Sequence, residues 1–128
     1  MQYINLTPHP VFVQLKDSET ACFSPLFVGN EKKLVLRAKS DEFNSELGMA
    51  VKKLTPYFAY VDKDGKITPL ETDKMPRLFI CGKGKIRFVV SLKTLIATGG
   101  SFMGVRCVAP SGVRVKDGVK VASYLMTI

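Results

Sequence analysis

The sequence predicts a β-rich α+β fold, either a small, mostly antiparallel sheet or a partly open barrel, with one or two short helices. Three observations support this class. β-Branched and aromatic residues gather in short runs, which favour strands. Lys-Asp-Gly occurs between such runs at 63–65 and again at 116–118, as in hairpin loops. The chain has 128 residues, of which 46% are hydrophobic. This is enough for one core, so we expect a single globular domain over 1–128.

The first strands are predicted at 3–7 and 11–15. Pro8 and Pro10 lie between them. Because proline fixes φ and lacks an N–H, the chain must bend there or follow a sheet edge. Leucine and alanine at every second position of 34–39 predict a third, half-buried strand.

Residues 40–54 allow two interpretations. An apolar stripe at helical spacing, with Ser40 as N-cap and Pro56 beyond the end, favours an amphipathic helix. Gly48 weakens such a helix by about 1 kcal/mol relative to alanine, so an irregular strand is the alternative. The stripe consists of Phe43, Leu47, Ala50, Val51 and Leu54.

Both Lys-Asp-Gly segments are expected to form three-residue hairpin loops with glycine in the left-handed conformation. At 63–65 this loop pairs Val61 with Ile67. A two-residue turn would instead set Lys63 against Lys66, and these like charges repel.

The second loop, at 116–118, pairs Val115 with Val119 and sets Arg114 opposite Lys120. Adjacent like charges destabilise a hairpin unless a counter-charge is near. If a neighbouring strand shares the sheet, one basic face results, formed by Lys85, Arg87, Arg114 and Lys120. A solvated face, partly neutralised by acids from the first part of the chain, is the alternative.

A strand at 86–90 is followed by a short helix at 92–97. Ser91 is placed to cap the amino terminus of this helix, and Gly99 is placed to end it. The helix residues expected to face the core are Leu92, Leu95 and Ile96.

The net charge of +8 is concentrated toward the carboxyl terminus. Residues 1–74 hold ten Lys/Arg and ten Asp/Glu, whereas 75–128 hold nine and one. This asymmetry indicates an anionic partner, with nucleic acid bound non-specifically as one form of it; a contribution to solubility alone is the alternative. No apolar run approaches the roughly 18 residues that span a bilayer, and no signal peptide is visible. We therefore expect a cytoplasmic protein without a membrane partner.

Catalytic and metal-binding motifs are scarce. His9 is the only histidine and no Gly-x-Ser-x-Gly elbow is present, so an enzyme is the less favoured class. Cys22, Cys81 and Cys107 lack metal-ligand spacing and are expected to be buried free thiols. Neither a metal nor a cofactor is predicted. The glycine-containing segment 82–85 is expected to be a hairpin turn, with phosphate contact as the alternative.

Four features of the sequence occur together: the motif Asn5-Leu6-Thr7-Pro8-His9, the segment 89–97, Arg106 with Ala109-Pro110, and a closing hairpin. In their order they resemble a family of small phage, prophage and actinobacterial proteins with an NLTPH opening. The chain departs from that family at Ser111-Gly112, where the family carries an aspartate. The resemblance implies a phage-related setting, hence the host cytoplasm. It draws attention to Asn5, Thr7, His9, Ser91 and Arg106.

These observations favour a non-enzymatic, phage-type accessory protein that binds a small anionic ligand, such as a nucleotide or a host-defence signal, alone or as a homo-oligomer. The alternatives are an inhibitor of a host protein, a non-specific nucleic-acid binder that uses the basic face, and a minor virion or assembly protein. The expected ligand-binding residues are Asn5, Thr7, His9, Arg87, Ser91, Arg106, Arg114 and Lys120.

Overall fold

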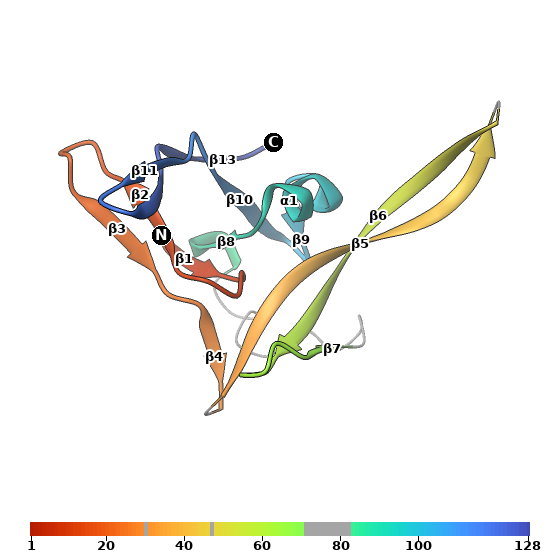
Figure 1. The fold of residues 1–128 in the computed structure, drawn as a ribbon, viewed down its shortest axis with the longest axis horizontal. Coiled ribbons are helices and arrows are strands. Elements are labelled where there is room, and N and C mark those ends of the chain that lie inside the picture. The colour runs from red at the N-terminus through yellow and green to blue at the C-terminus, as the bar shows by residue number, and fades with distance from the viewer. Residues whose placement is uncertain (30, 47, 71–82) are drawn as a thin grey trace.

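A computed structural model describes residues 1–29, 31–46, 48–70 and 83–128. The β-rich α+β class is confirmed, because strands dominate the described residues and one α-helix accompanies them (Figure 1). The strands pair into three open sheets rather than one, and none of the three closes on itself in this part of the chain.

The central sheet has the strand order β1-β8-β10-β13, and β9 also pairs with β10. Its strands are β1 (Gln2–Asn5), β8 (Ile86–Val89), β9 (Ser101–Phe102), β10 (Val105–Ser111) and β13 (Tyr124–Met126). β8 runs parallel to both β1 and β10, whereas β9 and β13 are antiparallel to β10. The expected antiparallel pairing is therefore only partly confirmed. Parallel neighbours need a crossover, and helix α1 (Leu92–Thr98) supplies it between β8 and β10.

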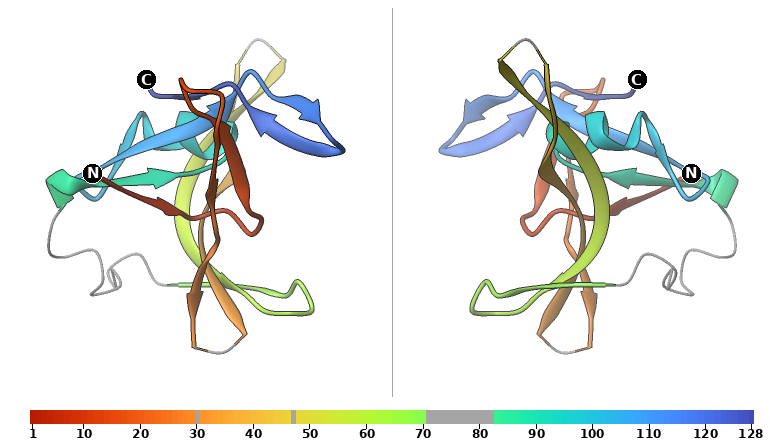
Figure 2. Two further views of the ribbon diagram at one scale, coloured as in Figure 1. Left: turned by 90° about the vertical axis from the view of Figure 1, so that its left-hand side faces the viewer. Right: turned by 90° about the vertical axis from the view of Figure 1, so that its right-hand side faces the viewer.

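The other two sheets lie on opposite sides of the central one (Figure 1). One has the order β11-β12-β2-β3, with β2 (Val11–Gln14), β3 (Thr20–Phe23), β11 (Arg114–Lys116) and β12 (Val119–Ala122). The other has the order β4-β5-β6-β7, with β4 (Leu26–Val28), β5 (Lys32–Glu46), β6 (Met49–Val61) and β7 (Ile67–Pro69). β5 and β6 form a long curved ribbon that crosses the direction of the central strands (Figure 2).

The helix expected over 40–54 is wrong, and the strand alternative is closer to the structure. The β5–β6 ladder continues from Lys33 and Val61 outward to Glu46 and Met49, with one irregularity between Glu42 and Asn44. Gly48 has φ +77°, a conformation that suits a turn between strands and not a helix. The continuous ladder therefore overrides the helical spacing of the apolar residues.

The first hairpin loop is confirmed. Val61 pairs with Ile67, and the Gly65 amide donates to the carbonyl of Asp62 at 3.0 Å. The carboxylate of Asp62 also accepts from the Lys66 amide at 2.8 Å. This side-chain bond fixes the loop, since aspartate often accepts from amides further along a turn.

The predicted length of the second hairpin loop is wrong by one residue. Arg114 pairs with Val121 and Val115 with Lys120, so the loop has two residues, Asp117 and Gly118, with φ 53° and 79°. Two positive φ values match the twist of the flanking strands, and aspartate tolerates the first of them. The shift places Arg114 and Lys120 on opposite faces. The expected Arg114–Lys120 pair does not form.

Helix α1 has the predicted caps but a narrower buried side than predicted. The Ser91 hydroxyl accepts from the Thr94 amide at 3.3 Å, and Gly99 ends the helix with φ 67°. Leu95 is fully buried, whereas Leu92 and Ile96 are 49% and 56% exposed. The inward orientation expected for those two side chains is therefore wrong, because this short crossover touches the core along one edge only.

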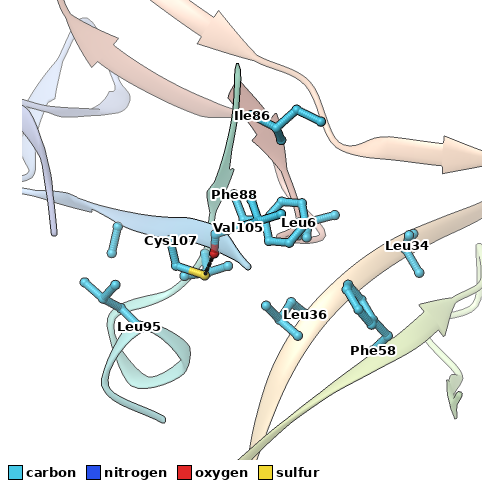
Figure 3. Close-up of a cluster of buried hydrophobic side chains, with 11 residues drawn as sticks. Leu6, Leu34, Leu36, Phe58, Ile86, Phe88, Leu95, Val105 and Cys107 are labelled. Carbon is cyan, nitrogen blue, oxygen red and sulfur yellow. Dashed lines mark hydrogen bonds between the residues drawn. The ribbon is translucent and has the colours of Figure 1, made fainter. Parts of the chain in front are cut away.

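The main core fills the space between the central sheet and the β5–β6 ribbon. Leu34, Leu36 and Phe58 of the ribbon face Leu6 and Phe88 of the central layer (Figure 3). The Phe58 and Phe88 rings meet edge to face, with centroids 6.3 Å apart, a favoured aromatic geometry.

Val35 is buried as well, so the predicted half-buried character of 34–39 is wrong at that position. Its side chain lines a cavity together with Pro8 and Ser91. The chain corner after β1 and the start of α1 thus cover the second face of β5.

Replacement of Leu95 with alanine should lower the free energy of unfolding by about 2–5 kcal/mol, because it leaves a cavity in the core. Ile96→Ala is the matched control and should change it by less than about 0.5 kcal/mol. Urea denaturation of both variants measures the difference. Equal losses would contradict the orientation of α1.

Candidate anion-binding site

A cavity of about 200 Å³ lies where the corner after β1, strand β5 and the start of α1 meet. The polar side chains that line it are Thr7, Arg37, Ser91, Lys93 and Thr94. Two of them, Thr7 and Ser91, belong to the residues predicted to bind ligand. The described residues that line the cavity include no aspartate or glutamate.

Backbone bonds at Leu36 hold this junction together. The Leu36 amide donates to the carbonyl of Leu6 at 3.0 Å, and the Leu36 carbonyl lies 3.4 Å from the Thr94 hydroxyl. Leu36 itself is 3% exposed. Since these bonds use the edge of β5 that faces away from β6, they position the next residue, Arg37, at the cavity.

Arg37 supplies the least satisfied group in the site. Its Nε atom is buried and has no hydrogen-bond partner among the described residues. A buried donor without an acceptor is costly, and more so when it carries charge. An anion in the cavity, which Arg37 lines, would neutralise the charge of this guanidinium.

Lys93 adds a second cation, and its residue is exposed at the cavity rim. The hydroxyl groups are less free than the cations. Ser91 Oγ accepts from the Thr94 amide and lies 3.0 Å from Thr94 Oγ1. The Ser91 hydroxyl therefore caps the helix, and a ligand would share it with Thr94.

Asn5 builds the corner instead of lining the cavity. It is 2% exposed, and its Nδ2 donates to the carbonyls of His9 and Phe23, each at 2.8 Å. Its Oδ1 accepts from the Thr7 amide at 2.9 Å. Because these bonds occupy both donors of the amide, we assign Asn5 to the folding of the corner.

The other predicted residues lie in different places. His9 is exposed on the corner. Arg87 and Arg106 are register partners on the parallel strands β8 and β10. Arg114 donates to Gln14 Oε1 at 2.6 Å, and Lys120 lines a separate cavity of about 160 Å³. A single basic face that includes Arg114 and Lys120 is therefore not formed.

The cysteines only partly match their expected burial. Cys107 is buried, and burial raises the pKa of its thiol. Cys22 is exposed, because it lies on the edge strand β3 and faces away from the covered side. Cys81 lies outside the described residues.

The described part of the chain has neither a metal-binding cluster nor a membrane-spanning helix. It holds no group of three or more His, Cys, Asp or Glu side chains that could bind a metal ion. It also holds no helix long and apolar enough to cross a bilayer. The segment expected as a turn at 82–85 contains a short 3₁₀ helix, η2 (Lys83–Lys85), and its first residue is not among those described.

Comparison with known proteins gives no relative: no family model, curated protein or solved structure matches the chain. The resemblance to phage-type proteins with an NLTPH motif therefore stays a prediction.

The sequence pattern around Arg37 indicates a functional residue, although the comparison of net charge between 1–74 and 75–128 does not. Arg37 belongs to the electrically neutral part, 1–74, yet it stands between Leu36 and Ala38 in an apolar strand. A cation flanked in this way is rarely buried without a partner. Lys93 carried no comparable signal, because it depends on how α1 meets β5.

Replacement of Asn5 with alanine should destabilise the protein by about 2–4 kcal/mol, because the His9 and Phe23 carbonyls each lose one donor and the Thr7 amide loses its acceptor. His9→Ala removes an exposed side chain of the same corner and should cost less than about 0.5 kcal/mol. Thermal or urea unfolding distinguishes the two. Full stability of Asn5→Ala would contradict its structural assignment and reopen its role in ligand binding.

Proposed function

We propose that the protein binds a small anionic ligand in the cavity at Arg37. The observation that carries this proposal is a cavity lined by two cations, Arg37 and Lys93, and by no described carboxylate; the Arg37 Nε is also buried without a partner. Arginine binds phosphate and carboxylate with charge-assisted hydrogen bonds, which are about twice as strong as neutral ones.

The cavity volume bears on the kind of ligand. About 200 Å³ is less than the roughly 300–1,000 Å³ of pockets that enclose drug-sized molecules. A phosphate or carboxylate group fits inside, held by Arg37; the Thr7 hydroxyl donates to Asn5 Oδ1 at 2.6 Å and serves the corner instead. The rest of a larger ligand, such as a nucleotide, would extend past Lys93.

Binding without turnover is the proposed mode of action. The described polar lining consists of hydroxyl groups and cations, which suit an anion better than they suit proton abstraction. Together with the resemblance to phage and prophage proteins, this favours a protein that holds a nucleotide or a related host-defence signal. The ligand would be removed from its host receptor by mass action.

The experiment has two parts. Purified protein is denatured and the released small molecules are identified by mass spectrometry; the folded protein is then titrated with phosphate, pyrophosphate and adenosine nucleotides by calorimetry. At least one of these anions should bind. Arg37→Met should weaken that binding by about 10–100-fold, the loss expected for a hydrogen bond to a charged group. Lys66→Met removes the same charge from an exposed hairpin and should have little effect.

Stability separates a binding role from a structural one. Without ligand, Arg37→Met should be as stable as the parent protein or more stable, because it removes an unpartnered buried donor. A large loss of stability, or unchanged anion affinity in Arg37→Met, would refute the proposal.

A further inference from the structure

Four polar side chains form a row across the central sheet. Tyr3 on β1 is in register with Arg87 on β8, Arg87 with Arg106 on β10, and Arg106 with Ser101 on β9. Register partners share a face of the sheet. This row, Tyr3–Arg87–Arg106–Ser101, lies on the face opposite the main core, because the alternate positions on β8 and β10 supply core residues. Val89 and Val108 are buried further along the same face, but at the row itself Tyr3, Ser101 and Arg106 are exposed and Arg87 is half-buried.

The two arginines create an unbalanced charge. Neighbouring strands lie about 4.8 Å apart, and like charges in register destabilise a sheet. The ion pairs found among the described side chains join Lys39 to Asp41 and Lys63 to Glu31, so neither includes Arg87 or Arg106. Arg87 donates one bond, to a backbone carbonyl at 3.0 Å, and Arg106 is exposed. Both can therefore reach an anion.

An aromatic surface adjoins the arginines. Tyr3 is 38% exposed, and its ring meets that of Phe23, with centroids 5.5 Å apart and planes at 50°. Aromatic rings beside cations on an open sheet are the features that bind unpaired bases and the phosphates that link them. The cavity at Arg37 has no aromatic side chain in its lining, so the two places differ in chemistry.

We propose that the Tyr3–Arg87–Arg106–Ser101 row binds single-stranded nucleic acid. Arg87 and Arg106 contact successive phosphates, and Tyr3 stacks on a base. The row crosses four strands, about 14 Å, which suits a short stretch of an extended strand. A duplex keeps its bases paired and gives Tyr3 no free face to stack on. This site is separate from the anion cavity and does not depend on it.

Fluorescence polarisation with a labelled oligo(dT) of about 20 nucleotides, and with a duplex of equal length, tests the proposal at about 50 and 200 mM salt. The single strand should bind more tightly than the duplex. The variant Arg87→Gln/Arg106→Gln should weaken binding at least tenfold and reduce the salt slope by about 1.4, since each single-strand phosphate contact contributes about 0.7.

The matched control is Arg114→Gln/Lys116→Gln, which removes the same charge from the exposed β11–β12 hairpin and should weaken binding less than threefold. Tyr3→Leu should weaken binding of the single strand about 5–100-fold without changing the salt slope. Arg37→Met should bind the oligonucleotide as the parent protein does, which separates this proposal from the cavity.

Equal losses in the two charge variants would mean that net charge alone attracts the strand and would overturn the proposal. So would equal affinity for duplex and single strand, or no binding at about 50 mM salt. If the double variant at Arg87 and Arg106 does not fold, Arg106→Gln alone decides, because that side chain is exposed.

Discussion

The backbone bonds at Leu36 are the constraint on which the rest of the structure depends. Through its amide and carbonyl, the long β5–β6 ribbon is joined both to the corner after β1 and to helix α1. The Leu36 side chain then closes the core against the central sheet. The next residue, Arg37, is left with a buried charged donor at the junction. Packing and the candidate site thus share one origin, since the contacts that bury Leu36 also shape the cavity.

The cations of the chain are divided among several places in the structure. The excess lies in residues 75–128, yet Arg37, whose Nε is buried without a partner among the described residues, comes from the neutral part. Within the basic part, Arg87 and Arg106 are brought into register, whereas Arg114 and Lys120 are turned to opposite faces by the hairpin register. Net charge therefore predicts an anionic partner but not its position, because position depends on strand pairing between distant segments.

Helix caps and one hairpin loop were predicted well, whereas strand pairing was not. The Ser91 cap, the Gly99 stop and the 63–65 loop depend on a few neighbouring residues, and all three are present. The helix prediction for 40–54 failed because the segment folds back on itself as the end of the β5–β6 hairpin, with Ser40 opposite Leu54 and Glu46 opposite Met49, and this pairing outweighs weak helical propensity. The 116–118 loop failed because strand pairing favoured a two-residue turn. The parallel pairing of β8 and β10 could have been predicted, since a strand, a short helix and a second strand follow one another in the sequence.

The central claim is that the Arg37 side chain is the anion receptor. Nuclear magnetic resonance of the arginine Nε–H groups tests it directly during a titration with phosphate or pyrophosphate, with Arg37→Lys used to assign the signal. The Arg37 Nε–H signal should shift as the guanidinium gains an anionic partner, while the signals of Arg87 and Arg106 move little. Movement of those two signals with Arg37 unchanged, or no movement of any signal, would contradict the account.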